Sequence, residues 1–545
     1  MHELDVLFIG AVMDYDGSNG SLANYIRCND KWQAPFQFIY GKRRQVFASE
    51  AQTCVYDIPN LSICKLVDFL KRRLDLKFHI VWHFNYHKEE VLDLLQNSPP
   101  KLVAISSTLA FYPQYLNTCV AWLNKHKKPE TRIVVGGKWV YSQYKNFDLS
   151  AKLERFLVQA NADYFIINRY GEETLYQLLL ALKSGDPSKV RDLPNLAYRQ
   201  DAVPGNHKSQ LCLYDGKRYR INRVINEEQV PGRPMIDFTN IGAKFIGDIV
   251  HVRTSSSCPF HCRFCTFPHL QGKFVLFDID DIIVQLRQLK NMGVKYLYFI
   301  DDTFNVPLKR FETLMDRMIQ EKLDMQWVSF FRPQFANGDI VTKMLEAGCR
   351  MVYCGVESGN DEILKKMGKH VTLEQYHQGL DWLDRVGIIV AVSYIVGYPG
   401  ETYETAMDTL RLVNDPRITF SRGGVFYYDP EAPVGKLAEE YGLTGFGAEW
   451  RHHTMDSQEA ARIHMEMIDK LESINVPHSD GGGWSLFNLY CHGLNMADLK
   501  ALYREFNEIQ KMQIQEAGQE AFRQYRVFAP KPKQPGHAKT TYSTG

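Results

Sequence analysis

The sequence feature that most restricts the possible folds is a repeated alternation of short apolar runs with helix-like segments between residues 236 and 430. Segments 279–291 and 373–386, for example, have the apolar spacing of helices that pack against a sheet. Units of this kind form parallel strands with right-handed crossovers, so the loops that follow the strands lie on one rim. The pattern therefore predicts a partial (β/α)6 barrel. Its candidate strands are 249–253, 296–300, 327–331, 351–355, 389–395 and 424–428.

Residues 1–185 predict a second α/β unit. Apolar runs at 6–10, 102–106, 132–135 and 162–167 alternate with helix-like segments, which is typical of a doubly wound, Rossmann-like parallel sheet. Such sheets bind ligands at the carboxyl ends of their strands. The candidate ligand-binding residues at those ends are Ser106, Ser107, Thr108, Gly136, Gly137, Gly171 and Glu172.

The other regions predict simpler structure. Residues 186–235 contain several prolines and glycines and are expected to be a linker. Residues 431–525 are expected to be helical, most clearly at 457–474 and 496–512. Residues 526–545 are rich in lysine, proline and threonine and are expected to form a disordered tail.

The composition argues against several classes of protein. Because 64 Lys and Arg balance 63 Asp and Glu, we expect no nucleic-acid or anionic-membrane partner. The longest apolar stretch, 388–396, is too short to cross a bilayer, and residues 1–5 lack the basic start of a targeting signal. Eleven cysteines, an odd number, argue against a disulfide framework and for a reducing compartment. We therefore expect a cytoplasmic protein, and we expect it to be a monomer.

Three cysteines, Cys258, Cys262 and Cys265, lie within a short polar loop after the first predicted barrel strand. Thiolates at this spacing can each reach a different iron of one cubane cluster, and three ligands leave the fourth iron open. A structural zinc site with His261 or His269 as fourth ligand is an alternative, although zinc sites usually take their ligands as two separated pairs. Cysteines packed as small apolar side chains are a further alternative.

The cysteine loop also resembles the signature of the radical S-adenosylmethionine (SAM) superfamily, CxxxCxxC with an aromatic residue, Phe264, before the last cysteine. Three further segments, 301–304, 355–359 and 395–402, follow predicted strands in order. They resemble the DDTF, GVESG and GxPGET segments of cobalamin-dependent members of that superfamily. The resemblance implies a radical SAM barrel whose three cysteines hold a [4Fe–4S] cluster, with the open iron binding the amino and carboxylate groups of SAM.

The resemblance further implies which residues surround SAM. Asp301 or Asp302 is expected to receive the ammonium group, and Arg332 is expected to face the carboxylate. Helix capping by the aspartates and a tight turn at the later glycines are the alternatives. The other expected cofactor contacts are Glu357 and Ser358 at the ribose, Gly397 and Gly400 at the adenosine, and Phe264 in the cysteine motif.

The first unit resembles the cobalamin-binding domain that accompanies this barrel in some family members. Many such domains use a DxHxxG motif whose histidine ligates cobalt, and this sequence has none. His83 and His87 lack the spacing and fall in a segment that leads into a helix. We therefore expect cobalamin to bind without a protein histidine ligand. A bound nucleotide, or a sheet that is only a scaffold, is the alternative.

Aromatic and polar residues beyond the barrel resemble segments of a natural-product subgroup, of the phosphinate methyltransferase type and, more distantly, the tryptophan methyltransferase type. We expect them near the substrate, at the mouth of the barrel. The alternative is that the tryptophan is a core residue and the histidines lie on the surface. The residues are Tyr427, Tyr428, Trp450 and His453.

The expected function is that of a cobalamin-dependent radical SAM methyltransferase. It would transfer a methyl group to an unactivated carbon or phosphorus centre of a small-molecule or peptide substrate in natural-product biosynthesis. An external electron donor of the flavodoxin or ferredoxin type would supply the reducing electrons. The alternatives are a non-methylating rearrangement, cyclisation or deoxygenation, and a non-catalytic iron–sulfur or cobalamin-binding regulator. A methylthiotransferase is disfavoured because Cys28, Cys54 and Cys64 form no second cysteine triad.

Overall fold

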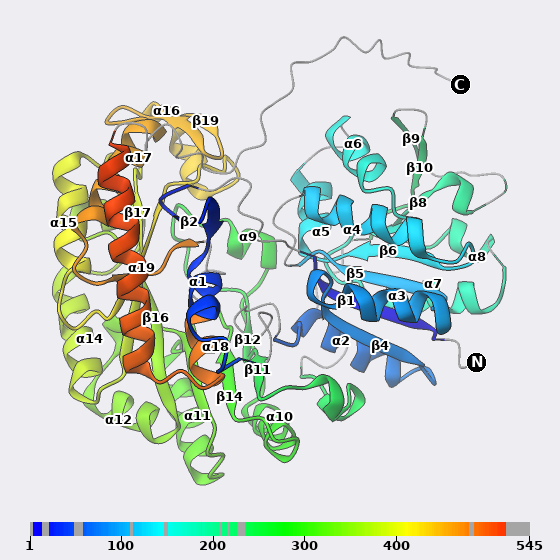
Figure 1. The fold of residues 1–545 in the computed structure, drawn as a ribbon, viewed down its shortest axis with the longest axis horizontal. Coiled ribbons are helices and arrows are strands. Elements are labelled where there is room, and N and C mark those ends of the chain that lie inside the picture. The colour runs from blue at the N-terminus through cyan, green and yellow to red at the C-terminus, as the bar shows by residue number, and fades with distance from the viewer. Residues whose placement is uncertain are drawn as a thin grey trace.

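The chain folds into two α/β lobes that lie side by side in Figure 1, each built around one large sheet. The sheet of the first lobe has eight strands, and that of the second lobe has seven. The computed structural model describes residues 4–12, 21–47, 58–108, 113–146, 151–186, 188–203, 205, 210–214, 217–225, 235–478 and 484–518.

The first lobe contains the doubly wound sheet that the sequence predicts. Alternate residues of β1 face opposite sides, so that Phe8 packs with Ile63 in one hydrophobic cluster and Leu7 packs with Val91 in another. Both faces are therefore covered by helices. The parallel strands, in spatial order, are β4 (Phe78–His83), β1 (Val6–Ala11), β5 (Leu102–Ser106), β6 (Arg132–Gly136) and β7 (Tyr164–Ile166). One face is covered by the helices α2 (Leu61–Lys71) and α7 (Glu172–Lys183). The other face is covered by α3 (Lys88–Asn97), α4 (Pro113–His126) and α6 (Ala151–Ala160).

The sheet of this lobe is larger than expected. Strand β4 was not predicted, since His79, Trp82 and His83 interrupt the apolar pattern. His83 ends this strand, and the segment that contains His83 and His87 leads into α3, as expected. The expected linker at 186–235 instead contributes three strands, which extend the sheet beyond β7. The hydroxyl of Tyr219 in the added strands donates to the backbone oxygen of Ala162 at 2.7 Å and anchors them to the lobe. These strands are β8 (Leu196–Arg199), β9 (Gln210–Tyr214) and β10 (Lys217–Ile221), and the helices α5 (Lys138–Asn146) and α8 (Ser188–Arg191) complete the lobe.

The second lobe contains the predicted parallel sheet, with its strands in chain order and helices on the outer side. The sixth predicted strand, 424–428, is displaced, since β18 begins at Phe420. A short seventh strand, β21, also joins the sheet. The strands are β11 (Ile249–Val252), β14 (Tyr296–Phe299), β15 (Gln326–Phe330), β16 (Cys349–Glu357), β17 (Ile389–Val396), β18 (Phe420–Val425) and β21 (Ile474–Asn475), and the outer helices are α10 (Ile279–Asn291), α11 (Leu308–Gln320), α12 (Gly338–Glu346), α14 (Leu373–Arg385) and α15 (Tyr403–Val413).

The inner side of this sheet is closed toward the amino ends of the strands. Helix α18 (Trp484–Cys491) packs Phe487 edge-on against Tyr296 and Tyr298 of β14, and the Tyr490 hydroxyl donates to Gln326 at 2.9 Å. Helix α19 (Met496–Ala517) joins the same hydrophobic cluster. The predicted helical region 431–525 includes α17 (Ser457–Lys470), α18 and α19. The hairpin β19 (Thr444–Phe446)–β20 (Glu449–Arg451) in the same region was not predicted.

Residues 21–47, which we call the crossing segment, leave the first lobe after β1 and pack on the second lobe beside α19 (Figure 1). The backbone N–H and oxygen of Arg27 both pair with the side-chain amide of Gln513 at 2.8 Å. Lys42 forms an ion pair with Glu505 at 2.6 Å. Helix α1 (Pro35–Lys42) of this segment places Phe36 and Ile39 in the cluster that closes the barrel. The two lobes are therefore joined by packing as well as by the chain.

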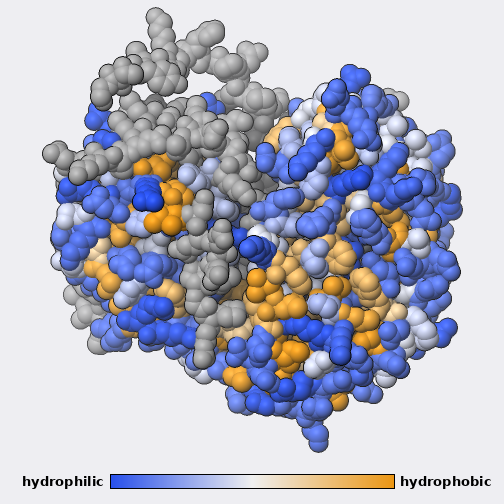
Figure 2. Space-filling view, turned by 180° about the vertical axis from the view of Figure 1, so that it is seen from behind, coloured by the Kyte–Doolittle hydropathy of each residue, from blue (hydrophilic) through white to orange (hydrophobic). Residues whose placement is uncertain are grey.

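The outer surface is mainly hydrophilic on the face shown in Figure 2, where apolar side chains form scattered patches. Within the described residues, no helix combines the length and apolarity needed to cross a membrane. The expected tail at 526–545 lies outside the described residues.

Candidate functional site

The cysteine loop, residues 258–265, lies at the carboxyl end of the first barrel strand, directly after β12 (Ser255–Ser256). The backbone N–H of Cys265 donates to the oxygen of Cys262 at 3.0 Å, which folds the loop into a turn. The sulfur of Cys258 lies 3.5 Å from the hydroxyl of Thr303, and a guanidinium nitrogen of Arg332 lies 3.6 Å from the sulfur of Cys262. Residues that follow β14 and β15 therefore lie next to two of the predicted cluster ligands.

Arg263 fixes the loop to the rest of the barrel. Its backbone N–H donates to Met367, its backbone oxygen accepts from Val434, and both distances are 2.8 Å. Its guanidinium donates to the backbone oxygen of Lys366 at 3.1 Å. Lys366 ends α13 (Asp361–Lys366), so the loop is tied to the segment that follows β16. Arg263 was not predicted from the sequence, because a single arginine between two cysteines belongs to no motif of its own.

The thiol of Cys265 lies where a negative charge is disfavoured. Burial first, and then the neighbouring Cys262, Cys258 and Asp302, raise the pKa of Cys265 to about 11. A bound metal reverses this effect by stabilising the thiolates. Among the described residues, no three His, Cys, Asp or Glu side chains converge as one metal ion would require. A cubane cluster takes each thiolate at a different iron, so the donor set fits that group.

The two aspartates after β14 have different surroundings. Asp301 is fully buried and accepts hydrogen bonds from the backbone N–H of Thr254 at 2.9 Å and the hydroxyl of Ser255 at 2.6 Å. Its carboxylate therefore joins the ends of β11 and β14. Burial raises the pKa of the half-buried Asp302 to about 6, against the opposing effect of Arg253. The carboxylate of Asp301 is therefore occupied by hydrogen bonds from Thr254 and Ser255. Asp302 makes no such bonds to them, so it is the better candidate for the ammonium group.

Arg332 lies between the cysteine loop and the barrel. Its guanidinium stacks over the ring of Phe260 at 3.4 Å, while one nitrogen approaches Cys262. The other terminal nitrogen, Nη1, is buried and makes no hydrogen bond to any described residue. A buried guanidinium with an unused donor is suited to a carboxylate ligand. This geometry agrees with the predicted role at the SAM carboxylate.

Glu357 ends β16 with a backbone φ of +66°, a left-handed conformation that is uncommon for glutamate. Its carboxylate forms a buried ion pair with Lys369 at 3.2 Å. The ammonium of Lys369 also lies 5.9 Å from the ring centre of Phe264 in the cysteine loop. The pair therefore links the predicted ribose-binding residue to the predicted cluster loop.

Ser358, the second predicted ribose contact, is fully buried. Its hydroxyl accepts the backbone N–H of Asn360 at 3.2 Å and lies 3.4 Å from the hydroxyl of Thr409. Asn360 in turn caps α13. The serine therefore supports the start of a helix, and the ribose prediction is left to Glu357.

Gly397 and Gly400 have φ values of +89° and +90°, which require glycine. At Gly397 a Cβ would lie 2.6 Å from both Trp450 and Ala460, and at Gly400 it would lie 2.5 Å from the ammonium nitrogen of Lys366. At both positions the atoms closest to the glycine are therefore side-chain atoms of the protein itself. The alternative of a tight turn describes these glycines.

The carboxyl of Glu401 is enclosed by this turn. Its Oε2 accepts the backbone N–H of Gly397, whose oxygen lies 3.1 Å from Nε2 of His452. Glu401 is fully buried, and its Oε1 has no hydrogen-bond partner among the described residues. Burial raises its pKa from an ordinary value of 4.5 to about 8.

We expect this carboxyl to make folding stability depend on pH. Between pH 4.5 and 8 the folded state keeps the proton of Glu401 while the unfolded state has lost it, so the free energy of unfolding falls as pH rises. The slope is at most about 1.4 kcal/mol per pH unit. Urea unfolding at about pH 5 and pH 8 should show that Glu401→Gln gains stability relative to the wild type as pH rises. A pH-independent difference would contradict this assignment.

The predicted substrate residues lie around the hairpin β19–β20, but their burial differs. Trp450 is 4% exposed and donates from its indole to the backbone oxygen of Phe426 at 2.6 Å, so it is a core residue as the alternative held. Tyr428 is also buried, and His453 is exposed beside Gly442. Tyr427 is 54% exposed, and the centre of its ring lies 6.4 Å from the centre of the exposed ring of Phe446.

The predicted residues of the first lobe do gather at the carboxyl edge of its sheet. The hydroxyl of Ser107 donates to the backbone oxygen of Gly136 at 2.8 Å, and that of Ser106 accepts the backbone N–H of Thr108 at 3.4 Å. Gly137 has a φ of +111°, and a Cβ there would lie 3.0 Å from the hydroxyl of Thr108. These contacts fix the loops after β5 and β6 against each other.

The loop after β7 completes this edge. Gly171 precedes α7, and Glu172 forms an ion pair with Lys65 at 2.8 Å. Asn168 is 4% exposed, and both atoms of its side-chain amide lack a hydrogen-bond partner among the described residues. Asn168 was not predicted from the sequence, although it directly follows the predicted strand 162–167. An unsatisfied buried amide at a strand end is suited to a polar ligand.

The carboxyl edges of the two sheets meet. Lys138, which directly follows Gly137, places its ammonium 4.3 Å from the ring centre of Phe267 in α9 (Phe267–Gln271), two residues beyond Cys265. Arg169, after β7, approaches so closely that a Cβ on Gly272 would lie 2.5 Å from its guanidinium. The candidate sites of both lobes therefore face one interface.

Comparison with known families decides the chemistry of the barrel. Residues 252–413 match the model of the radical SAM superfamily. This part of the chain is a radical SAM domain. The match begins in β11 and ends with α15, so it includes the cysteine loop and the segments that contain Asp302, Arg332 and Glu357. Membership of this superfamily implies a [4Fe–4S] cluster and SAM.

Curated relatives of the enzyme are distant. An uncharacterized methyltransferase of Pyrococcus horikoshii is 24% identical over 367 residues, which cover 67% of this chain and 75% of the relative. A ribosomal protein uS12 methylthiotransferase, RimO, of Alkaliphilus oremlandii is 25% identical over 218 residues, or 38% of this chain and 49% of the relative.

Solved structures share the fold of the enzyme across both lobes. The radical SAM methyltransferase TsrM from Kitasatospora setae, with tryptophan substrate and a SAM analogue, superposes with a TM-score of 0.57 at 13% identity. The superposition covers 94% of this chain and all of TsrM. The cobalamin-dependent radical SAM enzyme OxsB, with aqua-cobalamin, gives a TM-score of 0.52 at 13% identity over 95% of this chain and 81% of OxsB. These likenesses establish the two-lobe α/β architecture.

Proposed function

We propose that this radical SAM enzyme is a cobalamin-dependent methyltransferase that acts on an unactivated carbon or phosphorus centre of a natural-product precursor. The observation that carries the proposal is that the carboxyl edge of the first lobe's sheet meets α9, directly after the cysteine loop, where the ammonium of Lys138 lies 4.3 Å from the ring centre of Phe267. Fold likeness to TsrM and OxsB, whose structures contain cobalamin, and the methyltransferase name of a relative support it.

The residues of the barrel would hold the first two cofactors. Cys258, Cys262 and Cys265 would bind the [4Fe–4S] cluster, Asp302 and Arg332 would bind the ammonium and carboxylate of SAM, and Glu357 would bind the ribose. When bound, the cluster and SAM supply a 5′-deoxyadenosyl radical after reduction by an external electron donor, and cobalamin supplies the methyl group. The protein would position these groups and exclude water between the lobes.

The first lobe would bind cobalamin along its carboxyl edge. Ser106, Thr108 and Asn168 offer hydroxyl and amide groups to a ligand that is rich in amides. His83 lies at this edge in register with Ala11, but it is 1% exposed and packs against Tyr86 with ring centres 4.5 Å apart. This environment supports binding without a histidine ligand to cobalt.

Replacing Asn168 by leucine should weaken cobalamin binding at least tenfold without unfolding the protein. Leucine has a similar volume and removes two buried polar atoms that have no partner in the described structure, so the fold should not lose stability. The matched control is Asn97→Leu in α3, where the asparagine is exposed. Anaerobic titration with hydroxocobalamin, followed by its visible spectrum, gives both affinities. Equal affinity in Asn168→Leu and the wild type would argue against this site.

The reaction class is tested with SAM that carries a labelled methyl group. Anaerobically reconstituted enzyme with a reductant should form 5′-deoxyadenosine and transfer the label to a product. Formation of 5′-deoxyadenosine without label in the product would instead indicate rearrangement, cyclisation or deoxygenation. No 5′-deoxyadenosine despite an intact cluster would indicate a regulator.

A further inference from the structure

Phe260 lies in the cysteine loop, between Cys258 and Cys262. Its ring lies against the guanidinium of Arg332, whose central carbon is 3.4 Å from the ring centre. The ring of Phe335 stacks on Phe260, with the ring centres 6.4 Å apart and an angle of 28° between the planes. A cation over an aromatic face is attracted by the ring, and more strongly where water is excluded. The two stacked rings therefore support the guanidinium.

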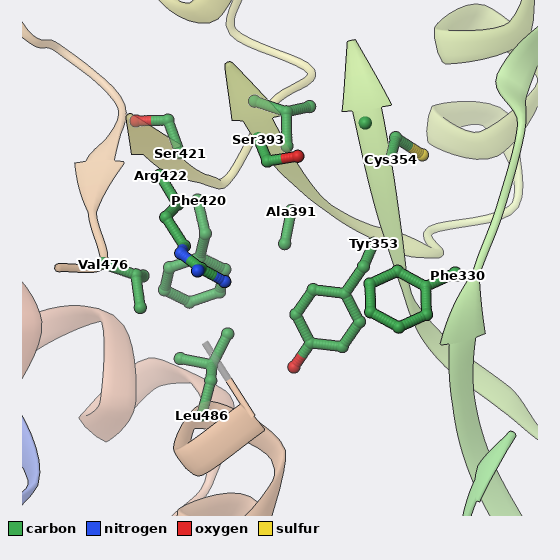
Figure 3. Close-up of a pocket in the computed structure, with 12 residues that line it drawn as sticks. Phe330, Tyr353, Cys354, Ala391, Ser393, Phe420, Ser421, Arg422, Val476 and Leu486 are labelled. Carbon is green, nitrogen blue, oxygen red and sulfur yellow. The ribbon is translucent and has the colours of Figure 1, made fainter. Parts of the chain in front are cut away.

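The strand before Arg332 directs its side chain into the barrel. Strand β15 ends at Phe330, which lines the interior beside Tyr353 (Figure 3). Phe331 continues the ladder by donating its backbone N–H to the oxygen of Tyr353 at 2.9 Å, and its ring faces Phe311 of the outer helix α11. Successive side chains of an extended backbone point to opposite sides. Arg332 is also extended, with φ of −100° and ψ of 106°, so its side chain faces inward again.

The side-chain amide of Asn305 fixes the backbone of Arg332. Its Nδ2 donates to the backbone oxygen of Arg332, and its Oδ1 accepts the backbone N–H, both at 3.0 Å. Asn305 is fully buried and lies in the same loop after β14 as Asp302. Because the backbone is held at both polar atoms, the remaining freedom of Arg332 is that of its long side chain. The groups that touch the guanidinium therefore determine its orientation.

The two terminal nitrogens of this guanidinium have different surroundings. Nη2 lies 3.6 Å from the sulfur of Cys262, to which it can donate a hydrogen bond. Nη1 is buried and has no hydrogen-bond partner among the described residues. The guanidinium is planar, so a single orientation sets the directions of both nitrogens. The same orientation therefore serves a predicted cluster ligand and leaves Nη1 available to the predicted carboxylate of SAM.

We propose that Phe260, together with the stacked ring of Phe335, is a positioning residue for Arg332. It holds the guanidinium so that Nη2 donates to the sulfur of Cys262 while Nη1 donates to the SAM carboxylate. Hydrogen bonds to the cysteine sulfurs set the reduction potential of an iron–sulfur cluster, and a cationic donor raises it by stabilising the added negative charge. The stack at Phe260 therefore supports both reduction of the cluster and binding of SAM. The second effect rests on the proposed function, whereas the first does not require SAM.

The first measurement is the reduction potential of the reconstituted cluster in the full-length enzyme without SAM, from a redox titration followed by electron paramagnetic resonance. Arg332→Gln removes the charge and should lower the ratio of reduced to oxidised cluster at a fixed potential about tenfold, or about 59 mV for a one-electron couple. Phe260→Leu removes the ring and should lower the same ratio by about threefold or more. Phe260→Tyr keeps the aromatic face and should retain the wild-type potential.

The second measurement is the affinity for SAM, from calorimetric titration of the oxidised, reconstituted enzyme. Phe260→Leu should weaken SAM binding by about tenfold or more, and Phe260→Tyr should bind like the wild type. The matched control is Tyr296→Leu, which removes a half-buried ring that packs on Phe487 at the amino end of β14. This control should change neither quantity. Iron is counted in every variant, so that loss of the cluster is distinguished from a shifted potential.

An unchanged potential and SAM affinity in Phe260→Leu with its iron intact overturns the proposal, and so does failure of Phe260→Tyr to retain the wild-type values. If Phe260→Leu loses iron, Phe335→Leu decides, because it leaves the cysteine loop intact and should shift both quantities in the same direction; unchanged values there also overturn the proposal.

Failure of the proposed function is read separately, in the wild type, as 5′-deoxyadenosine without label in the product. Neither measurement depends on that outcome, so shifts in Phe260→Leu would still support the positioning role.

Discussion

Replacing Cys262 by alanine is expected to abolish reductive cleavage of SAM. Cys262 is 7% exposed and lies beside Arg332 at the centre of the cysteine loop. A cluster held by three thiolates has no substitute ligand when one is removed. Anaerobic reconstitution should give about four irons per chain in the wild type and a large loss in the variant, with no detectable 5′-deoxyadenosine.

The matched control for this variant is Cys349→Ala. Cys349 lies in β16 of the same lobe and is fully buried, but it is remote from the loop in sequence and packs in the hydrophobic core. It should retain the iron content and the cleavage activity of the wild type. A Cys262→Ala protein that cleaves SAM normally would remove the basis for the cluster assignment. Stoichiometric zinc without iron in oxygen-free wild-type protein would favour the zinc alternative instead.

Replacing Lys369 by methionine is expected to lower the free energy of unfolding by about 3–5 kcal/mol. The side chains of Lys369 and Glu357 are 7% and 12% exposed, so the variant leaves a carboxylate buried without its partner. Glu357 also ends β16 in a left-handed conformation, which the ion pair helps to hold. Urea unfolding of the enzyme without cofactors measures the loss.

A second substitution separates the buried charge from lost packing. In the double variant Lys369→Met, Glu357→Gln no charge remains at the site, so most of the stability should return. Lys343→Met removes partly exposed ion pairs with Glu312 and Asp316 on the barrel surface and should cost less than about 1 kcal/mol. If Lys369→Met costs no more than this control, the buried pair does not stabilise the fold as argued.

Most of the barrel could be predicted from the sequence because its strands are short apolar runs between polar loops. Strand β17 was expected at 389–395 and spans Ile389–Val396. Strand β18 was expected at 424–428 but begins four residues earlier, at Phe420. Ser421, Arg422 and two glycines replace the apolar residues that mark a buried strand, and the following aromatic residues misled the assignment.

The candidate site could be predicted only where residue type and spacing carry the signal. The cysteine spacing located the loop, but it could not distinguish Asp301 from Asp302, since the difference depends on which donors the fold brings to each carboxylate. Arg263 and Lys369 act through partners that are distant in sequence, so no local pattern identifies them. Lys138 could have been noticed as a cation immediately after a strand-end glycine pair.

The crossing segment has a consequence for how the protein is made. Arg27 and its partner Gln513 are 486 positions apart, so the early segment leaves the ribosome long before the helix that receives it. Until α19 is synthesised, Phe38 of this segment lacks the ring of Phe506, against which it packs edge-on with ring centres 5.8 Å apart. Nascent chains therefore carry an incompletely packed segment through most of translation, a state that favours misassembly.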